Sequence, residues 1–154
     1  MTTAIDVREL PQQRLLVKKT TCGHKEIGPA FAKAVHQVGE CFRASGAKMA
    51  SMPMAVYLAW RVTDCDLAAG CKVEGDVTLA NGCEWLDLPA GPHAFASHFG
   101  PYDSLQETHQ AVMKWCAANG KKMVGPCFEA YPTDPGLEPD MTKWQTDVYY
   151  PVGA

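Results

Sequence analysis

A single carboxylate stands in the middle of an apolar stretch near the end of the chain, in the segment PCFEAYPTDP. Side chains alternate across a strand, so Glu129 would share one face of a short strand with Cys127 and Tyr131. Phe128 and Ala130 would share the other face, which suits packing against a helix. We therefore expect Glu129 and Tyr131 to point away from the helix, into a groove. The alternative is a solvated carboxylate on an open sheet.

A carboxylate surrounded by aromatic rings is suited to binding a bulky organic cation, because the acid supplies charge and the rings supply cation–π attraction. The strand pattern offers several aromatic side chains for such a site, although an ordinary core position is the alternative for each of them. The predicted ligand contacts are Glu129, Tyr57, Trp85, Phe95, Tyr131 and Tyr149, with Tyr150 as the alternative to Tyr149.

A carboxylate withdrawn from water is also suited to acid–base catalysis. If the protein is an enzyme, we expect Glu129 and Tyr131 to be the catalytic residues, with Glu129 activating water and the phenol stabilising negative charge. Other catalytic patterns are missing from the sequence. It contains no GxSxG motif, no glycine-rich phosphate loop, and no histidine or cysteine spacing typical of a metal site. We therefore expect no metal and no cofactor.

Composition narrows the class of protein. The 154 residues are 47% hydrophobic and 20% charged, which indicates a packed globular domain. The formal charge is −3 and the 14 basic residues are scattered, so we expect no direct binding of nucleic acid. No apolar run is long enough to span a membrane. The beginning of the chain does not resemble a signal peptide, and the seven cysteines are odd in number, which together predict reduced thiols and a cytoplasmic location.

Hydrophobic periodicity predicts two helices, each followed by two strands. Pro29 suits the first turn of one helix and Gly46 its end, while Ser104 and Glu107 form a capping-box signature for the other. Each helix must pack on one sheet face, which leaves a groove between the two halves. The predicted helices cover about 28–45 and 101–120, and the predicted strands cover 14–20, 53–62, 65–73, 83–91, 92–100, 127–131 and 144–152.

Several short motifs occur in an order that resembles one known family. They are LPAG at 88–91, HFGPY at 98–102, FEAY at 128–131 with a following Asp134-Pro135, and YPV at 150–152. In this order and spacing they are similar to the GyrI-like small-molecule-binding family, which includes effector-binding domains of multidrug-responsive transcription regulators. The resemblance covers nearly the whole chain from about residue 14, and it is strongest in the second half.

The resemblance implies a single α+β domain of two β-α-β-β repeats, at about 14–75 and 83–152. It implies antiparallel sheets, a pseudo-two-fold relation and a ligand groove between the halves. It also implies that Glu129 is the acid that contacts ligands in multidrug-binding members. Regulators of this family carry a helix-turn-helix domain first, whereas only about 13 residues precede the first predicted strand here. We therefore expect no direct role in transcription.

Three functions follow from these patterns. The first is a cytoplasmic binder of aromatic and cationic small molecules, such as drugs and other xenobiotics. The second is a hydrolase of electrophilic compounds, because some relatives in the family act on cyclopropane-bearing alkylating agents. The third is an inhibitor of a topoisomerase through protein contacts, for which the acidic, proline-rich segment PTDPGLEPD could supply the surface. Our prediction is the binder, with a small molecule as its partner.

Overall fold

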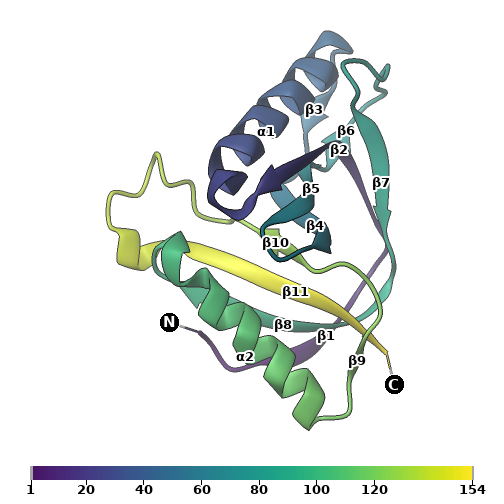
Figure 1. The fold of residues 1–154 in the computed structure, drawn as a ribbon. Coiled ribbons are helices and arrows are strands. Elements are labelled where there is room, and N and C mark those ends of the chain that lie inside the picture. The colour runs from purple at the N-terminus through teal and green to yellow at the C-terminus, as the bar shows by residue number, and fades with distance from the viewer. Residues whose placement is uncertain (1, 154) are drawn as a thin grey trace. The chain divides into compact units, whose positions relative to one another are not determined.

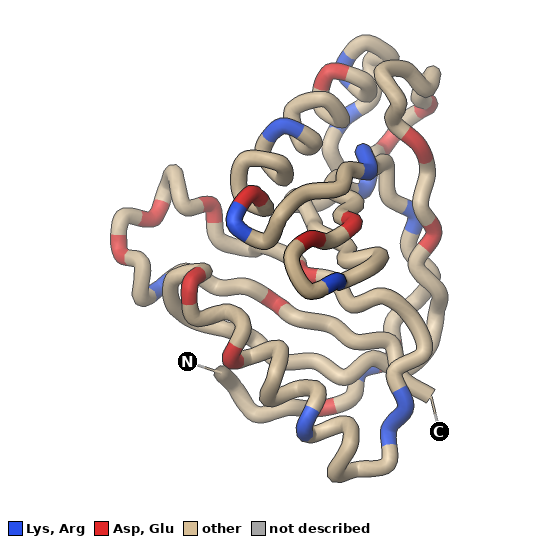
Figure 2. The backbone as a smooth tube through the Cα atoms, in the orientation of Figure 1, with Lys and Arg blue, Asp and Glu red and all other residues tan. Residues whose placement is uncertain are grey.

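A computed structural model describes residues 2–153 of the chain (Figure 1). The chain divides into two compact units. Unit 1 contains residues up to 11 together with those from 90 onward, and unit 2 contains the segment Gln12–Pro89. Lysine, arginine and acidic positions are scattered through both units without an extended stretch of one sign, as Figure 2 shows.

Unit 1 is an antiparallel sheet with one α-helix on it. Its strands lie in the order β1-β8-β11-β10, and the short β9 pairs with β11. The elements are β1 (Asp6–Leu10), β8 (Gly91–Phe99), the 3-10 turn η2 (Tyr102–Ser104), α2 (Leu105–Ala118), β9 (Lys122–Met123), β10 (Phe128–Ala130), the 3-10 turn η3 (Met141–Lys143) and β11 (Gln145–Gly153).

Unit 2 also consists of an antiparallel sheet and one α-helix. Its strands lie in the order β4-β5-β2-β7, and β3 and β6 form a small separate pair. The elements are β2 (Gln13–Gly23), the 3-10 turn η1 (His24–Glu26), α1 (Ile27–Ala44), β3 (Lys48–Met49), β4 (Met54–Trp60), β5 (Asp64–Cys71), β6 (Val73–Glu74) and β7 (Glu84–Leu88).

The two units repeat one strand order. In unit 1 the strand before the helix is β8, and it pairs with the last strand after the helix, β11, which pairs with β10. In unit 2 the equivalent strands are β2, β5 and β4. The predicted antiparallel α+β fold, with a strand, a helix and two further strands in each half, is therefore confirmed.

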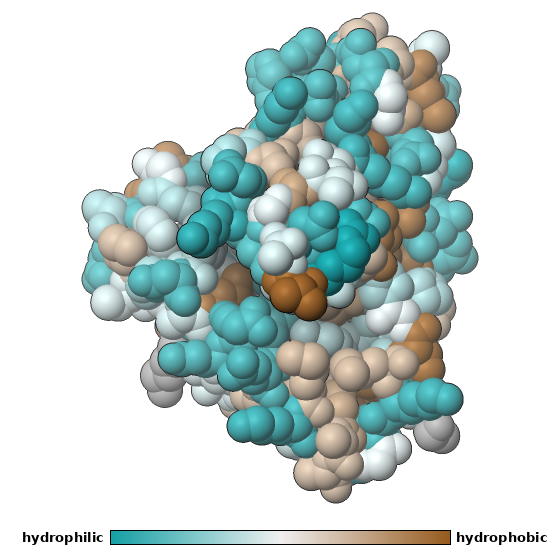
Figure 3. Space-filling model, viewed as in Figure 1, coloured by the Kyte–Doolittle hydropathy of each residue, from teal (hydrophilic) through white to brown (hydrophobic). Residues whose placement is uncertain are grey.

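Helix α1 forms where the periodicity predicts it. Ala34, Val38 and Phe42 lie on its buried side, where they pack toward the sheet of unit 2. Its end is set by Gly46, whose φ of 75° lies in the left-handed region that a residue with a Cβ rarely adopts. The surface over α1 is mainly hydrophilic in Figure 3, as expected for the outer side of an amphipathic helix.

Helix α2 begins at Leu105, after the turn η2, rather than at 101, and the predicted capping box is wrong. Ser104 makes no side-chain bond to the helix N-terminus. Its hydroxyl donates instead to the carbonyl of Pro101, at 3.0 Å, and it contacts the buried ring of His98, at 3.1 Å. His98 also bonds Thr108 of α2 at 2.9 Å. These bonds attach the turn η2 to β8 and fix the start of α2.

Two further differences from the sequence prediction concern strands. The sequence pattern predicts no element over Asp6–Leu10, yet these residues form β1, which pairs with β8. Most of β1 is exposed, so it has no alternating apolar pattern to reveal it. The strand expected over 83–91 does form, as β7, but it pairs with β2 and lies in unit 2 rather than with the second helix.

Candidate functional site

Glu129 is buried on the helix side of the sheet of unit 1. The residue is only 2% exposed. It lies opposite Val148 of β11, and Val148 packs in the core cluster with Val112 of α2. Residues that pair in an antiparallel ladder share a face, so Glu129 points toward α2. Our expectation that Phe128 would face the helix and Glu129 the opposite side is therefore wrong.

Phe128 lies on the other face, where it packs on Tyr149. Their rings are stacked with centroids 4.9 Å apart. Both Phe128 and Glu129 are almost fully buried, at 1% and 2% exposure. Alternation along a strand shows which residues share a face, but it cannot choose between two faces that are both covered.

The carboxylate of Glu129 has a different partner at each oxygen. Oε2 accepts a hydrogen bond from Nε2 of His109, at 2.5 Å, and Oε1 accepts one from the hydroxyl of Tyr131, at 2.6 Å. The other ring nitrogen of His109, Nδ1, lies 2.7 Å from the hydroxyl of Tyr150. A buried hydrogen-bonded chain therefore runs from Tyr131 through Glu129 and His109 to Tyr150.

His109 is the cationic partner of this carboxylate. Burial alone lowers the pKa of the imidazole, but its side-chain hydrogen bonds with Cys127 and Glu129, together with the charge of Glu129, raise the pKa to about 9. His109 is therefore protonated at neutral pH, and the pair is a buried ion pair. Burial also raises the pKa of the Tyr150 phenol, which stays neutral.

An aromatic cluster of Tyr131, Tyr102 and Trp144 leads from Glu129 to the surface. The rings of Tyr131 and Tyr102 meet edge to face at 6.1 Å, and those of Tyr102 and Trp144 lie 5.3 Å apart. The indole of Trp144 donates to the carbonyl of Glu138, at 2.8 Å, which fixes its orientation. Tyr102 is 41% exposed, yet burial and the charge of Glu129 both raise its pKa. The cluster therefore joins solvent to a buried negative group.

Two predicted ligand contacts, Phe95 and Tyr149, lie on the opposite face of this sheet from Glu129. They are partners in the β8–β11 ladder, and their ring centroids are 4.9 Å apart. The guanidinium of Arg8 lies over the ring of Phe95, 3.6 Å from its centroid. The structure thus brings Phe95 and Tyr149 together, but it does not bring them to the carboxylate.

The remaining two, Tyr57 and Trp85, belong to unit 2, on strands at opposite ends of its order. Tyr57 meets Trp60 edge to face at 5.7 Å. Trp85 packs against the core cluster beneath α1, with Arg14 over its ring at 4.5 Å. Within unit 2 these two rings do not form one site. The groove predicted between the halves stays a prediction, and the site described above lies wholly within unit 1.

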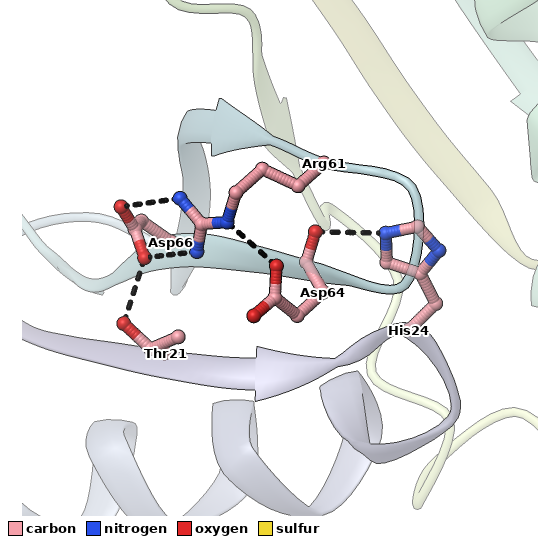
Figure 4. A network of polar contacts seen from close by, with 5 residues as sticks. All are labelled: Thr21, His24, Arg61, Asp64 and Asp66. Atoms are coloured by element: carbon pink, nitrogen blue, oxygen red, sulfur yellow. Dashed lines mark hydrogen bonds and ion pairs between the residues drawn. The ribbon is translucent and has the colours of Figure 1, made fainter.

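A second polar network lies at the β4–β5 turn of unit 2 (Figure 4). Arg61 donates to Asp64 at 2.6 Å and to both carboxylate oxygens of Asp66, at 2.7 and 3.1 Å. Thr21 donates to Asp66 from β2, and the ring of His24 bonds the carbonyl of Asp64. The bonds from Arg61 and Thr21 hold the pKa of Asp66 at about 2. Each charge here has a partner and is solvated, so the network fastens the turn.

Sequence reasoning missed His109, Tyr102 and Trp144. For His109 a signal was available, because it lies on the same buried side of α2 as Leu105, Val112 and Cys116. A histidine at an apolar position of an amphipathic helix needs a polar partner from the facing sheet. Tyr102 lies in the turn η2 and Trp144 lies between η3 and β11, and only the fold brings these two rings together.

The described residues contain no group of three or more His, Cys, Asp or Glu side chains that could hold a metal ion. The seven cysteines are all free thiols. Between residues 2 and 153, no helix is both long and apolar enough to cross a membrane. The site in unit 1 offers a buried carboxylate, an imidazolium and phenols.

Several solved structures share this fold. The C-terminal domain of EcmrR has a TM-score of 0.78 at 18% identity, with 97% of each chain covered. SAV2435, solved bound to tetraphenylphosphonium, has a TM-score of 0.71 at 14% identity, covering 99% of this chain and 95% of that one. A hydrolase from Listeria innocua has a TM-score of 0.63 at 12% identity, covering 97% and 91%. At these identities the likeness shows the fold alone.

This chain spans 57% of the EcmrR chain in its complex with DNA, at 18% identity and a TM-score of 0.80. Comparison with curated protein sequences finds no match. The model of one family, described as the GyrI-like small molecule binding domain, matches residues 3–153. The chain therefore belongs to the GyrI-like small-molecule-binding family.

Proposed function

We propose that the protein binds aromatic organic cations, with Glu129 as the anionic contact and the Tyr131, Tyr102 and Trp144 rings as the aromatic wall. The observation that carries this proposal is the bond from the Tyr131 hydroxyl to Oε1 of Glu129, because Tyr131 belongs to both the buried chain and the aromatic cluster. Aromatic rings beside a carboxylate attract a cation more strongly where water is partly excluded.

The comparisons support a ligand of this class. SAV2435, which shares the fold, was solved with tetraphenylphosphonium, a permanent cation with four phenyl rings. The EcmrR neighbour is a C-terminal domain of a protein that also forms a complex with DNA. The family model itself describes small-molecule binding. Transfer of the aromatic and cationic character to this chain is part of our proposal.

In this proposal a ligand reaches Glu129 along the aromatic cluster. The carboxylate is nearly inaccessible, whereas Tyr102 is 41% exposed, so the ligand first contacts Tyr102 and Trp144. It then replaces the Tyr131 hydroxyl at Oε1, while His109 keeps its bond to Oε2. Phe95 and Tyr149 are not contacts of this site, because they lie across the sheet. Contacts of the same ligand with Tyr57 or Trp85 stay predictions.

The test is a titration of the wild-type protein with tetraphenylphosphonium, monitored by tryptophan fluorescence, because Trp144 belongs to the proposed wall. We expect saturable quenching, and affinity at least about tenfold weaker for Glu129→Gln, which corresponds to about 1.4 kcal/mol. Glu107→Gln is the matched control, since Glu107 is an exposed carboxylate on α2. Equal affinity of all three proteins would remove Glu129 from the site, and no binding by the wild type would overturn the proposal.

A hydrolase is the second candidate, and the bonding of Glu129 favours it specifically. A carboxylate held between an imidazolium and a phenol resembles a general base with its orienting groups. Water would add to an electrophilic carbon, and its proton would pass to Glu129. The Tyr131 hydroxyl would donate to the oxygen released when an epoxide opens, or to the enolate oxygen formed when the C–C bond of an activated cyclopropane breaks, and the enolate carbon would then take up a proton. Mass spectrometry of an epoxide or activated cyclopropane incubated with substoichiometric protein distinguishes a binding protein from a hydrolase. Unchanged compound favours the binder, and turnover lost in Glu129→Gln favours the hydrolase.

A further inference from the structure

His109 and the proposed ligand would share one carboxylate. His109 bonds Oε2 of Glu129, and the aromatic cluster reaches Oε1 through Tyr131. We propose that a cation bound at Glu129 expels a proton from His109, so that the protein binds cations in exchange for a proton. The inference rests on the proposed function and names how the same site is regulated.

Charge balance is the first argument. In the unliganded site the imidazolium of His109 neutralises Glu129. A permanent cation that joined them would leave a net positive charge in a region where both side chains are at least nine-tenths buried. If His109 gives up its proton to the buffer, the carboxylate and the ligand neutralise each other instead. The site is then uncharged overall both before and after binding.

Tyr150 makes both protonation states of His109 possible. When the ring is charged, Nε2–H donates to Glu129 and Nδ1–H donates to the Tyr150 oxygen, 2.7 Å away. The Tyr150 hydroxyl then has Cys127 as its neighbouring acceptor. When Nδ1 loses its proton, the same hydroxyl can turn and donate to Nδ1, while Nε2–H still donates to Glu129. No buried polar atom of the pair loses its hydrogen bond in either state.

The groups around His109 favour release of the proton from this ring rather than from another titratable side chain. Glu129 supplies the facing carboxylate, and burial raises the pKa of the Tyr150 phenol, which is neutral at pH 7. The titratable groups that interact with His109 are Glu129 on β10, Cys127 just before that strand and Tyr150 on β11. Beyond them, Tyr131 bonds Glu129, the charge of Glu129 acts on Tyr102 of η2, and the ring of His98, on β8, bonds Thr108, the residue before His109.

The exchange makes affinity depend on pH. Two like charges that share one carboxylate in a partly buried site change each other's binding constant by roughly tenfold to a hundredfold. Affinity for a permanent cation should therefore rise roughly tenfold between pH 7 and pH 9, as the protonated fraction of His109 in the unliganded protein falls. A neutral aromatic ligand such as triphenylphosphine oxide should show no such rise.

Calorimetry of tetraphenylphosphonium binding at pH 8, in phosphate and in Tris, tests the proposal. This ligand has no proton to lose, so any difference in heat between the buffers reports protons exchanged by the protein. We expect release of roughly half a proton or more per cation bound. His109→Gln should abolish the release and bind about tenfold more tightly at pH 7. His36→Gln is the control, because His36 forms an exposed pair with Glu40 at 2.7 Å.

Each result decides the matter. Binding with equal heat in the two buffers overturns the inference and leaves the proposed function standing. Proton release that persists in His109→Gln also overturns it, because another group must then supply the proton. No binding by the wild type at any pH overturns the proposed function and the inference together. The wild-type comparison between buffers needs no substitution, so a variant that fails to fold does not prevent the decision.

Discussion

The ion pair of His109 and Glu129 should make the unliganded protein lose stability as the pH rises. The pKa of His109 is about 9 in the folded protein, against about 6.5 for an unfolded chain. The folded state therefore holds the proton more tightly, and this contribution is complete below pH 6.5 and lost as the pH rises through 9. The two values correspond to roughly 3 kcal/mol in all, of which roughly 2 kcal/mol disappears between pH 6 and pH 8.5.

Urea unfolding at pH values from 6 to 8.5 measures this loss. The range stops at 8.5 because burial raises the pKa of the Cys65 and Cys71 thiols to about 11, so their own destabilising effect begins where unfolded thiols ionise. We expect the unfolding free energy of the wild type to fall by roughly 2 kcal/mol more than that of His109→Gln over this range. The exposed-site variant His36→Gln should follow the wild type.

Parallel curves for the wild type and His109→Gln would refute this reasoning. They would mean that His109 has the same proton affinity folded and unfolded, and that it does not form a charged pair with Glu129 at neutral pH. A steeper fall in the variant than in the wild type would reverse the sign of the linkage, and it would assign the neutral imidazole to the folded state.

Two further predictions concern packing in unit 2 and the thiols. Gly70→Ala should prevent folding or lower the free energy of unfolding in urea by about 3 kcal/mol or more, because a Cβ there would lie 1.8 Å from the carbonyl oxygen of Leu16. Gly28→Ala is the control: a Cβ there would have no atom within 4 Å, so stability should change by about 1 kcal/mol or less. Brief alkylation should modify Cys22 and Cys127 first, since the other thiols are buried, and peptide mass spectrometry identifies the modified residues. Rapid labelling of all seven cysteines would contradict the core described here.

Much of the fold could be predicted from local pattern. The apolar stripe that includes Ala34, Val38 and Phe42 predicted α1, and Gly46 marked its end. Strand β1 could not be predicted in this way, because its residues are mostly exposed and it forms by pairing with β8. The pairing of β7 with β2 likewise depends on tertiary structure, and no local sequence pattern indicates it.

The site was only partly predictable, for a physical reason. Alternation placed Glu129 and Tyr131 on one face, and they do share a hydrogen bond. The choice of face depended on where Phe128 would pack. Its aromatic partner, Tyr149, lies on the face of the sheet that α2 does not cover. A three-residue strand with both faces covered has no contrast between a polar and an apolar side, so its sequence could not decide which face meets the helix.

The cost of the pair itself argues that it serves binding. A buried ion pair contributes less to stability than apolar side chains of similar volume, because both charges must leave water. Around the pair, unit 1 is otherwise built from Val112, Cys116, Val148 and similar residues, which show that an apolar solution was available at this depth. The pair instead lies where the Tyr131 ring joins the buried chain to an aromatic cluster that reaches solvent. In the proposed function, that position gives a cationic ligand access to the charge, and stability alone does not explain it.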